Sequence, residues 1–584
     1  MEGFFHALFF LIIQLYVIFT AWCTATAAAG IKQAASDRAA LLSFKSLVDD
    51  APFGALSSWN NSSLHYCRWR GVSCSRCHPD RVTALDLKSL RLAGFVSPAI
   101  ANLTFLRRID LSDNKLGGRI PEELGSLRRL RYLNLSVNSL HGTIPSSLGN
   151  CSNLQLLNLR DNKLDGEIPP TLSSLSGLRE LILRQNMLQG TIPDSLGNLS
   201  SLLLIDLDKN NLSGAMPPSF GSLPSLNILE IQDNSLTGTI PPTLTNLSSL
   251  NMLLLRGNNL HGEIPPFAEL PFLSYLDCSR NYLSGMIPKS LGRLSSLEII
   301  ILGMNNLTGE IPSSLYNLSS LKGLELIYNQ LEGTLPSNIG NALPNLQVLR
   351  MYDNQLGGQI PASLSNASEL YDLELSLNAF HGTIPQSLGA LQSLLRLILA
   401  LNQLEARKPS DWSFITALTN CTSLQVLDLR YNRLQGMLPK SLGNLSTSLN
   451  DLVLNSNQIS GIIPTEIEKL INLTILEVSG NDLRGTIPVE IGHLRQLQLL
   501  RLSNNMLSGE IPPTWGNLTR MYELDLGSNE FEGAIPPTLS KLLTLELLDL
   551  SNNSLSCSNE SPYERCDMTK VSKELSAARE RLLS

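Results

Sequence analysis

Leucine and asparagine recur along this chain with a period of about 24 residues. One copy of the pattern runs from Leu130 to Pro145 and reads L-x-x-L-x-L-x-x-N-x-L-x-G-x-I-P. An opening copy, Arg81 to Gly94, has Leu90 in the asparagine place and brings the number of copies to 20. The other copies carry a marker asparagine, at Asn114, Asn138, Asn162, Asn186, Asn210, Asn234, Asn258, Asn281, Asn305, Asn329, Asn354, Asn378, Asn402, Asn432, Asn457, Asn481, Asn505, Asn529 and Asn553.

Each copy predicts a short strand at L-x-L, a turn at the asparagine and a second extended segment that ends at the proline. Alternation along a strand points the leucines inward and the residues between them outward, and proline ends the second segment because it cannot donate a ladder hydrogen bond. A period of about 20–29 residues with this spacing is typical of a leucine-rich-repeat solenoid. We therefore predict an α/β-type leucine-rich-repeat solenoid of about 20 turns, curved or superhelical and right-handed, with a parallel β-sheet on the concave face.

The marker asparagine has a structural explanation. Its amide both donates and accepts hydrogen bonds, and at an inward turn position it can satisfy backbone groups that would otherwise be buried unpaired. We expect its recurrence to serve the fold and not a ligand.

Length and charge agree with one elongated, repetitive unit. The 584 residues would allow several globular domains, but in a solenoid each turn contacts only its neighbours. The formal net charge of -7, with 16% charged residues, favours neither nucleic acid nor an anionic membrane as a partner.

The N-terminal segment has the features of a secretory signal. Phe4 to Thr20 is apolar, and the small residues Ala25 to Ala29 follow it. The alternative is a membrane anchor, because the apolar stretch is long for a signal. No other run approaches the ~20 apolar residues that span a bilayer. We predict a signal peptide at residues 1–30, an N-terminal helical and disulfide cap at 31–80, the solenoid at 81–556, and a C-terminal cysteine pair with a divergent polar tail at 557–584.

The nine cysteines gather in part at the two ends of the repeats. Cys67 and Cys74 precede the first repeat, and Cys557 and Cys566 follow the last. Because secreted solenoids commonly close their core with disulfide-bonded caps, we predict a disulfide within each pair. Cys77 is either free or competes with Cys74. Cys151, Cys278 and Cys421 replace leucines and are expected to be buried thiols.

The first cap helix is predicted from Ser36 to Val48. Asp37 is a plausible cap, and the apolar face consists of Ala40, Leu41, Phe44, Leu47 and Val48. With Trp59 and Trp69, this helix is expected to cover the open end of the first turn.

One unit is longer than the others, since Asn402 and Asn432 are 30 residues apart. It lacks Gly-x-Ile-Pro and contains Asp411-Trp412-Ser413-Phe414. We favour a bulged convex loop in which Trp412 and Phe414 fill the core, over a loop that docks a partner.

Asn-x-Ser/Thr acceptor sites support an extracellular location, although many come from one repeated phrase and are not independent. Asn134 would place a glycan on the concave face and obstruct binding there. The acceptors that we predict to carry glycans are Asn61, Asn102, Asn198, Asn246, Asn317, Asn444 and Asn517.

These features resemble the extracellular half of plant leucine-rich-repeat receptor-like kinases. The phrase Asp37 to Lys45, the Leu56-Ser57-Ser58-Trp59-Asn60 step and Cys67-x-Trp69-x-Gly71-Val72-x-Cys74 match that family's N-terminal cap. The 30-residue unit looks like the branch that contains the rice bacterial-blight receptor, and the flagellin receptor belongs to the same wider group. Family members continue into a membrane-spanning helix and a cytoplasmic kinase, and this chain shows neither. Kinase activity is therefore not carried over, and a truncated product is one explanation.

A search for catalytic or metal-binding motifs favours a protein that is not an enzyme and has no cofactor or metal. The sequence contains no Gly-rich phosphate loop, His-Glu-x-x-His or nucleophile elbow. His141, His261 and His381 share one turn position, but five turns separate neighbours, about 24 Å at the strand spacing, too far for one zinc ion. Acidic residues such as Asp110, Glu230 and Asp549 are expected to stand singly on the strand face.

The outward positions of the middle turns are more apolar than those of the early and late turns, and an apolar patch with a polar rim is typical of an interaction site. The alternative is incidental variation along a long surface. The residues predicted to bind a ligand are Met252, Leu254, Arg256, Ile299, Ile301, Met304, Glu325, Ile327, Tyr328, Val348, Arg350 and Tyr352.

The sequence thus predicts a recognition module of receptor-like type for a peptide or protein elicitor in immunity or signalling. The resemblance implies a leucine-rich-repeat co-receptor kinase as a possible partner near the C-terminal turns. It also implies a location in the apoplast, or at the cell surface through a partner. The alternatives are a secreted inhibitor of a cell-wall hydrolase, or a nonfunctional truncated receptor product.

Overall fold

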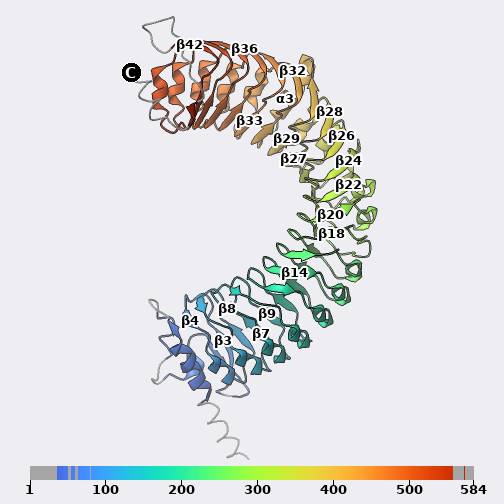
Figure 1. Cartoon of the computed structure of the whole chain (residues 1–584), viewed down its shortest axis with the longest axis vertical. Helices are drawn as coiled ribbons and strands as arrows, with labels where there is room; N and C mark the ends of the chain where they lie inside the picture. Colours follow the sequence, from blue (N-terminus) through green and yellow to red (C-terminus); the bar gives the residue numbers. More distant parts are fainter. Residues whose placement is uncertain (1–35, 50–53, 60–63, 79, 557–570, 573–584) are drawn as a thin grey trace, which may run out of the picture. The chain divides into compact units, whose positions relative to one another are not determined.

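The computed structural model describes residues 36–49, 54–59, 64–78, 80–556 and 571–572. The chain divides into two compact units: residues 1–261 with 269–273 form unit 1, and residues 262–268 with 274–584 form unit 2. Each unit has the repeat architecture, and in Figure 1 the strands of a unit follow one another in chain order. The predicted signal peptide, Asn61 and the Cys557–Cys566 pair lie outside the described residues.

The L-x-L segments form one ladder of short strands in each unit, which we call the first ladder. Its repeat strands pair in parallel, as predicted, and an antiparallel strand adjoins the ladder at β2 and at β43. In unit 1 it contains β2 (Val72–Cys74), β3 (Val82–Asp86), β5 (Arg108–Asp110), β7 (Tyr132–Asn134), β9 (Leu156–Asn158), β11 (Glu180–Ile182), β13 (Leu204–Asp206), β15 (Ile228–Glu230) and β17 (Met252–Leu254). In unit 2 it contains β19 (Tyr275–Asp277), β21 (Ile299–Ile301), β23 (Gly323–Glu325), β25 (Val348–Arg350), β27 (Asp372–Glu374), β29 (Arg396–Ile398), β31 (Val426–Asp428), β33 (Asp451–Val453), β35 (Ile475–Glu477), β37 (Leu499–Arg501), β39 (Glu523–Asp525), β41 (Leu547–Asp549) and β43 (Val571–Ser572).

The segments after the marker asparagines form a second, less continuous ladder. In unit 1 its strands are β1 (Val48–Asp49), β4 (Ala93–Phe95), β6 (Lys115–Gly117), β8 (His141–Gly142), β10 (Lys163–Leu164), β12 (Gln189–Thr191), β14 (Asn211–Ala215) and β16 (Ser235–Thr237). The strand β18 (His261–Gly262) lies where the two units divide. In unit 2 the strands are β20 (Tyr282–Gly285), β22 (Asn306–Glu310), β24 (Gln330–Thr334), β26 (Gln355–Gly358), β28 (Ala379–Gly382), β30 (Gln403–Ala406), β32 (Arg433–Met437), β34 (Gln458–Gly461), β36 (Asp482–Thr486), β38 (Met506–Gly509), β40 (Glu530–Ala534) and β42 (Ser554–Ser556).

Most repeats return to the next strand through a single 3-10 turn, and short α-helices are the exception. Proline stands at or just before the start of most of these turns, where its missing N–H costs nothing. The turns are η1 (Tyr66–Arg68), η2 (Pro98–Asn102), η3 (Glu122–Ser126), η4 (Ser146–Asn150), η5 (Pro170–Ser174), η6 (Asp194–Asn198), η7 (Pro218–Ser222), η8 (Pro242–Asn246), η9 (Lys289–Arg293), η10 (Ser313–Asn317), η11 (Ala362–Asn366), η12 (Gln386–Ala390), η13 (Pro409–Trp412), η14 (Lys440–Asn444), η15 (Thr465–Lys469), η16 (Val489–His493), η17 (Pro513–Asn517) and η18 (Pro537–Lys541). The α-helices cover residues 36–46, α2 (Ile339–Ala342) and α3 (Ser413–Leu418).

The leucines of the repeat fill the interior of each unit. On β21 an isoleucine, Ile300, stands at one of the leucine positions, and both it and Leu302 are completely buried, as are the equivalent residues of nearly every repeat. Cys151, Cys278 and Cys421 are buried among them and carry free thiols, as predicted. Burial raises the pKa of the Cys151 and Cys421 thiols to about 11.

The marker asparagines join each repeat to the one before it. In Asn138, the Nδ2 group donates to the carbonyl oxygens of Leu111, Leu135 and Ser136 at 3.0–3.1 Å. Its Oδ1 atom accepts from the backbone N–H of Leu116 at 2.9 Å. One side chain therefore satisfies groups of two consecutive turns, and the predicted structural role is confirmed.

The residue before a marker asparagine adopts the left-handed conformation, even where it is not glycine. Val137, Met304 and Tyr328 have φ values of 54°, 58° and 51°. Such backbone is unfavourable for residues with a Cβ atom and persists only when its surroundings fix it. The hydrogen bonds of the following asparagine provide that constraint.

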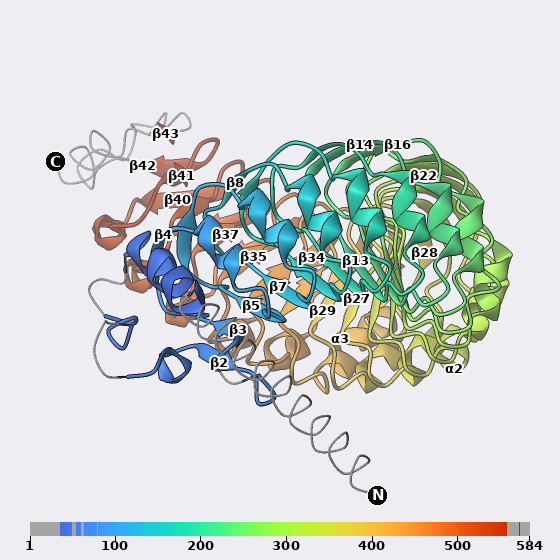
Figure 2. The same ribbon diagram turned by 90° about the horizontal axis from the view of Figure 1, so that it is seen from below.

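The N-terminal cap closes unit 1 (Figure 2). The helix ends at residue 46, two residues earlier than predicted, because Val48 and Asp49 pair with β4 as β1. Leu47 is 42% exposed, so it does not belong to the buried face. Trp59 is buried and stacks on Trp69 with their ring centroids 5.5 Å apart.

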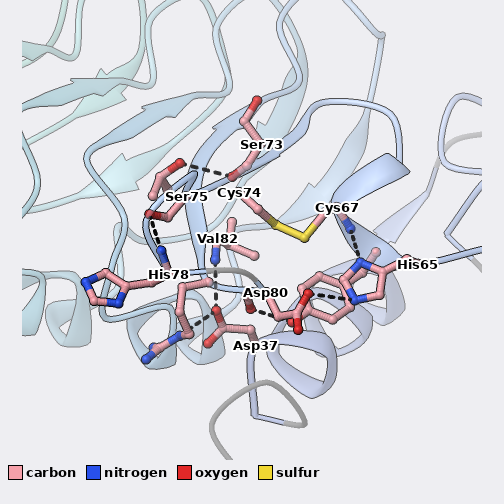
Figure 3. Close-up of a disulfide and its surroundings, with 12 residues drawn as sticks. Asp37, His65, Cys67, Ser73, Cys74, Ser75, His78, Asp80 and Val82 are labelled. Atoms are coloured by element: carbon pink, nitrogen blue, oxygen red, sulfur yellow. Dashed lines mark hydrogen bonds and ion pairs between the residues drawn. A yellow bond between two sulfur atoms is a disulfide. The ribbon is translucent and has the colours of Figure 1, made fainter. Parts of the chain in front are cut away.

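A disulfide lies within this cap, and an ion pair fastens the cap to the first repeat (Figure 3). The predicted Cys67–Cys74 disulfide is present, and Cys77 is free and exposed. Asp37 is not simply a helix cap: its buried Oδ2 accepts from Arg81 Nε at 3.1 Å and from the backbone N–H of Val82 at 2.9 Å.

The 30-residue unit keeps both ladders intact. Asn432 donates to Leu399 O across the longer unit and accepts from Leu404 N, each at 3.0 Å. The extra residues form η13 and α3, so the segment is helical where we expected a loop. Trp412 and Phe414 are buried, as predicted.

Removing one marker amide should destabilise the repeats around it. Asn305 donates to Cys278 O and accepts from Leu283 N, both at 3.0 Å, and is 7% exposed. We expect Asn305→Ala to lower the free energy of unfolding by about 1–3 kcal/mol, the usual cost of an unsatisfied buried polar group. Urea unfolding followed by intrinsic fluorescence measures this change.

The control is Gln330→Ala, which truncates an exposed side chain one residue after a marker asparagine. We expect it to change the free energy by less than about 0.5 kcal/mol. Equal effects of the two substitutions would contradict the structural role of the amide.

Candidate functional site

The candidate site is the outward face of the first ladder. Nine of the predicted residues lie in unit 2 and three, Met252, Leu254 and Arg256, lie in unit 1. Met252 and Arg256 are half-buried, whereas Leu254 is only 7% exposed. Leu254 is in register with Glu230 on β15, and its burial leaves little of it for a ligand to contact. The prediction that Leu254 offers a contact surface is therefore wrong.

In unit 2 the predicted residues come together on three consecutive strands. Ile299, Gly323 and Val348 are in register across β21, β23 and β25, and so are Ile301, Glu325 and Arg350. The glycine leaves room for its neighbour, since a Cβ atom at Gly323 would lie 2.9 Å from Ile299 Cδ1. Ile299 and Ile301 on β21 and Val348 on β25 are half-buried and lie on either side of β23. Together with Ile327 and Tyr352, which follow β23 and β25, they form an apolar surface that we call the apolar patch.

The aromatic side of the apolar patch is built from two tyrosines. The rings of Tyr328 and Tyr352 meet edge to face with centroids 4.8 Å apart, an arrangement that aromatic pairs favour. A hydrogen bond with Tyr328 is the main cause that raises the pKa of Tyr352 to about 12. The Tyr352 phenol is therefore a neutral hydrogen-bonding group at physiological pH.

An ion-pair network borders the apolar patch. Arg350 donates to Asp372 at 2.6 Å and to Glu325 at 3.2 Å, and Arg396 donates to Asp372 at 3.0 Å. Burial acts to lower the pKa of Arg350, but the hydrogen bonds and charges of Asp372 and Glu325 outweigh it and raise that pKa. Arg350 is therefore a fixed cation held in one orientation.

Sequence reasoning missed a further apolar column beside the apolar patch. Leu377, Leu401 and Tyr431 occupy the position before the marker asparagine, like Met304 and Tyr328. Leu401 is 36% and Tyr431 52% exposed. An open depression of about 570 Å³ lies among them, lined by Asp353, Asn354, Gln355, Leu377, Asn378, Ala379, Leu401, Asn402 and Tyr431. The missed signal was an apolar residue immediately before the asparagine.

The early turns contain a cluster of acids that we did not predict. Asp206, Asp208 and Glu230 have carboxylate oxygens within 4.8 Å of one another, so Glu230 does not stand singly as expected. Burial is the main cause that raises the pKa of Asp206 to about 7 and that of Asp208 to about 6. The strand register explains the grouping, because Asp206 lies directly beside Glu230.

The predicted acceptor sites within the described residues lie away from the first ladder. Six of them are exposed final residues of 3-10 turns: Asn102, Asn198, Asn246, Asn317, Asn444 and Asn517. Asn134, by contrast, is buried, and its Oδ1 accepts from the backbone N–H of Ser136. A glycan on Asn134 would require this side chain to leave its position.

Family models match the cap and the repeats. A model described as a leucine rich repeat N-terminal domain matches residues 34–75, and one described as a leucine-rich repeat region matches residues 89–232 and 407–567. A third, described as a leucine rich repeat, matches four segments within residues 225–367. The chain belongs to the leucine-rich-repeat family. Among the residues that the structure describes, no helix is both long enough and apolar enough to cross a bilayer.

Curated relatives of this leucine-rich-repeat protein are plant receptor kinases. Receptor kinase-like protein Xa21 of Oryza sativa subsp. japonica is 51% identical over 83 residues, which are 14% of this chain and 8% of that protein. The receptor-like kinase EFR of Arabidopsis thaliana is 46% identical over 88 residues, 15% of this chain and 8% of that protein. The aligned segments thus span only a small part of each relative. The predicted resemblance to plant leucine-rich-repeat receptor kinases is confirmed.

Several solved receptor structures resemble this leucine-rich-repeat protein. The complex of PEPR1 with AtPEP1 has a TM-score of 0.80 and 34% identity, covering 89% of this chain and 76% of that one. The Arabidopsis HAESA ectodomain with its peptide hormone IDA has a TM-score of 0.77 and 35% identity, covering 89% and 90%. The peptide hormone receptor RGFR1 with RGF2 has a TM-score of 0.74 and 35% identity, covering 84% of each chain.

The acidic cluster should make the stability of the protein depend on pH. The pKa of Asp206 is about 7 in the folded protein and near its usual value of 3.8 when the chain unfolds. The folded state therefore binds more protons between these values, and stability falls as the pH rises from about 4 to about 7. Asp206→Asn keeps an oxygen for the backbone N–H of Asp208 and should remove part of this fall.

Urea midpoints measured at pH 4, 6 and 8 at constant ionic strength test this dependence. We expect the urea midpoints of wild type and Asp206→Asn to differ least near pH 4, and the variant to have the higher midpoint at pH 8. Asp194→Asn, at an exposed acid of unit 1, is the control. A difference between wild type and Asp206→Asn that does not change with pH would contradict the prediction.

Proposed function

We propose that this chain is an extracellular recognition module of plant receptor type, which binds an extended peptide on the first ladder of unit 2. The observation that carries the proposal is the apolar patch, where Ile299 and Ile301 on β21 and Val348 on β25 flank β23, with Ile327 and Tyr352 just beyond the ends of β23 and β25. Contiguous exposed apolar surface with a polar rim marks interaction sites.

The geometry of the apolar patch suits an extended peptide chain. Its side chains repeat at the strand spacing of about 4.8 Å, so a peptide lying across the strands would meet a new contact at each repeat. Tyrosine and isoleucine supply apolar area, and the tyrosine hydroxyls supply hydrogen bonds. Tyrosine is enriched among the residues that dominate binding energy.

The ion-pair network would favour peptides that carry a charged group where they lie against Arg350. Arg350 is held by Asp372 and Glu325, so a bound anionic group would meet a cation whose position is already fixed. Such preorganisation reduces the entropic cost of binding. The neighbouring Glu374, half-buried on β27, offers a contact to a cationic group of the ligand.

The relatives support a receptor role outside the cell. RGFR1 is described as a plant peptide hormone receptor and HAESA in complex with a peptide hormone, and HAESA is also described with the co-receptor SERK1. By analogy, we propose that peptide binding by this chain creates a surface for a leucine-rich-repeat co-receptor kinase near its C-terminal repeats. The chain would then act through its partner, by recognition and not by catalysis.

Replacing the centre of the apolar patch should abolish peptide binding. The triple variant Ile301→Asp, Ile327→Asp, Tyr352→Asp places three carboxylates where we expect apolar contact. Peptides selected on the glycosylated secreted chain from a phage library of random linear peptides serve as probes. We expect their affinity, measured by calorimetry, to fall at least about a hundredfold, the equivalent of about 2.8 kcal/mol.

The matched control carries the same added charge at exposed apolar residues elsewhere in unit 2. It combines Ile471→Asp, Val489→Asp and Leu543→Asp, whose side chains are 57%, 53% and 73% exposed. We expect this variant to bind the selected peptides like wild type. An unchanged affinity of the folded patch variant, or a failure to select any saturable peptide, would overturn the proposal.

A further inference from the structure

The 30-residue unit creates a cavity on the side of unit 2 that carries the second ladder. Its volume is about 540 Å³, and it is lined mainly by apolar side chains. The lining comes from the segment before α3 and from the two following repeats: Arg407, Lys408, Pro409, Trp412, Gly436, Met437, Leu438, Pro439, Lys440, Ile462, Pro464, Thr465 and Glu466. None of these residues belongs to the apolar patch.

Trp412 forms one wall of the cavity, at a place where the ordinary repeat has a smaller side chain. In an ordinary repeat the residue after glycine in Gly-x-Ile-Pro covers the glycine of the next repeat, as Thr143 covers Gly166. In the 30-residue unit Arg407 stands at that position, after Ala406, but the Trp412 indole covers Gly436 instead, with Nε1 3.6 Å from where a Cβ atom of Gly436 would lie. The indole is fixed there because Nε1 donates to Gln435 O at 2.8 Å.

The wall of the cavity is apolar at positions that are polar in most repeats. The residue after glycine in Gly-x-Ile-Pro is usually threonine or glutamate, but it is Met437 and Ile462 in the two repeats that follow the 30-residue unit. These side chains are 68% and 59% exposed. Large apolar side chains in adjacent repeats therefore face solvent beside the tryptophan.

The rim of the cavity is positively charged. Arg407, Lys408 and Lys440 line it together with a single carboxylate, that of Glu466. Glu466 lies 3.4 Å from Lys440, and Arg407 pairs with Glu405 at 2.7 Å. Lys408 is exposed, and no described carboxylate lies within ion-pair distance of it. The rim can therefore attract a further anionic group.

We propose that this cavity binds a small amphipathic anion, with an apolar body against Trp412, Met437 and Ile462 and an anionic group at Lys408. Small-molecule sites are concave, about 300–1,000 Å³ in volume, mainly apolar and supplied with a few polar groups. The cavity meets each of these conditions, and its cations complement a carboxylate or sulfonate. It is a second site, independent of the peptide surface in the proposed function.

The probe for this site is 8-anilinonaphthalene-1-sulfonate, which joins an apolar aromatic body to one sulfonate. Fluorescence titration of the full secreted chain should show a saturable site. We expect Met437→Glu to weaken that site at least about tenfold, because it removes apolar contact and adds a carboxylate to the wall. Lys408→Glu should weaken it severalfold and reduce its dependence on salt.

The chain offers a closely matched control in the repeat at β20. Met286 stands at the same place as Met437 and is 66% exposed, but it does not line the cavity. Met286→Glu should leave the saturable site unchanged, and so should Lys289→Glu, whose residue corresponds to Lys440. N-phenyl-1-naphthylamine has the same rings without the sulfonate and should bind more weakly.

The outcomes separate this site from the peptide surface. The proposal would be overturned if Met437→Glu and Met286→Glu lowered the affinity for the probe equally. It would also be overturned if the charged and uncharged probes bound with equal affinity. Loss of the probe site in the folded Asp variant of the apolar patch with retention in Met437→Glu would overturn it as well, because the probe would then occupy the first ladder.

Discussion

The amide of the marker asparagine is the interaction on which the rest of the fold depends. Nearly every described marker side chain donates to carbonyl groups of its own turn and of the turn before, as Asn138 does with Leu135 and Leu111. This bonding fixes a residue with left-handed backbone immediately before the asparagine, and the same geometry recurs in successive repeats. Because stability in a solenoid comes from neighbour contacts, loss of one amide weakens two repeats together.

A fold held by inward leucines and asparagines leaves the outward positions free to vary. Function can therefore be encoded on the outside of the ladders without altering the core. The first ladder of unit 2 carries the apolar patch at Ile301 and Tyr352, whereas unit 1 carries the acids Asp206 and Asp208 on the equivalent face. The 30-residue unit is a second way to vary the surface. It inserts η13 and α3 after Leu404 without interrupting the amide ladder at Asn432.

Periodicity was sufficient to predict the repeat strands, the buried leucines and the role of the asparagines, because each follows from local spacing. The Cys67–Cys74 disulfide and the burial of Trp412 were also predictable, since few other places suit such residues. The contacts between repeats could not be predicted from the sequence. The pairing of Asp37 with Arg81, the grouping of Glu230 with Asp206, and the burial of Leu254 depend on register and packing between segments far apart in sequence. Leu401 and Tyr431 were missed because their exposure comes from the left-handed turn in which they lie, and strand alternation does not predict it.

The central claim, that ligands are recognised on the first ladder of unit 2, is tested most directly by mapping a bound peptide. A selected peptide carrying a photoreactive benzoylphenylalanine would be cross-linked to the secreted chain, and the adducts located by mass spectrometry. The account predicts adducts within residues 299–352, at or beside Ile301, Ile327 and Tyr352. Adducts confined to the 3-10 turns, or to the second ladder, would contradict it.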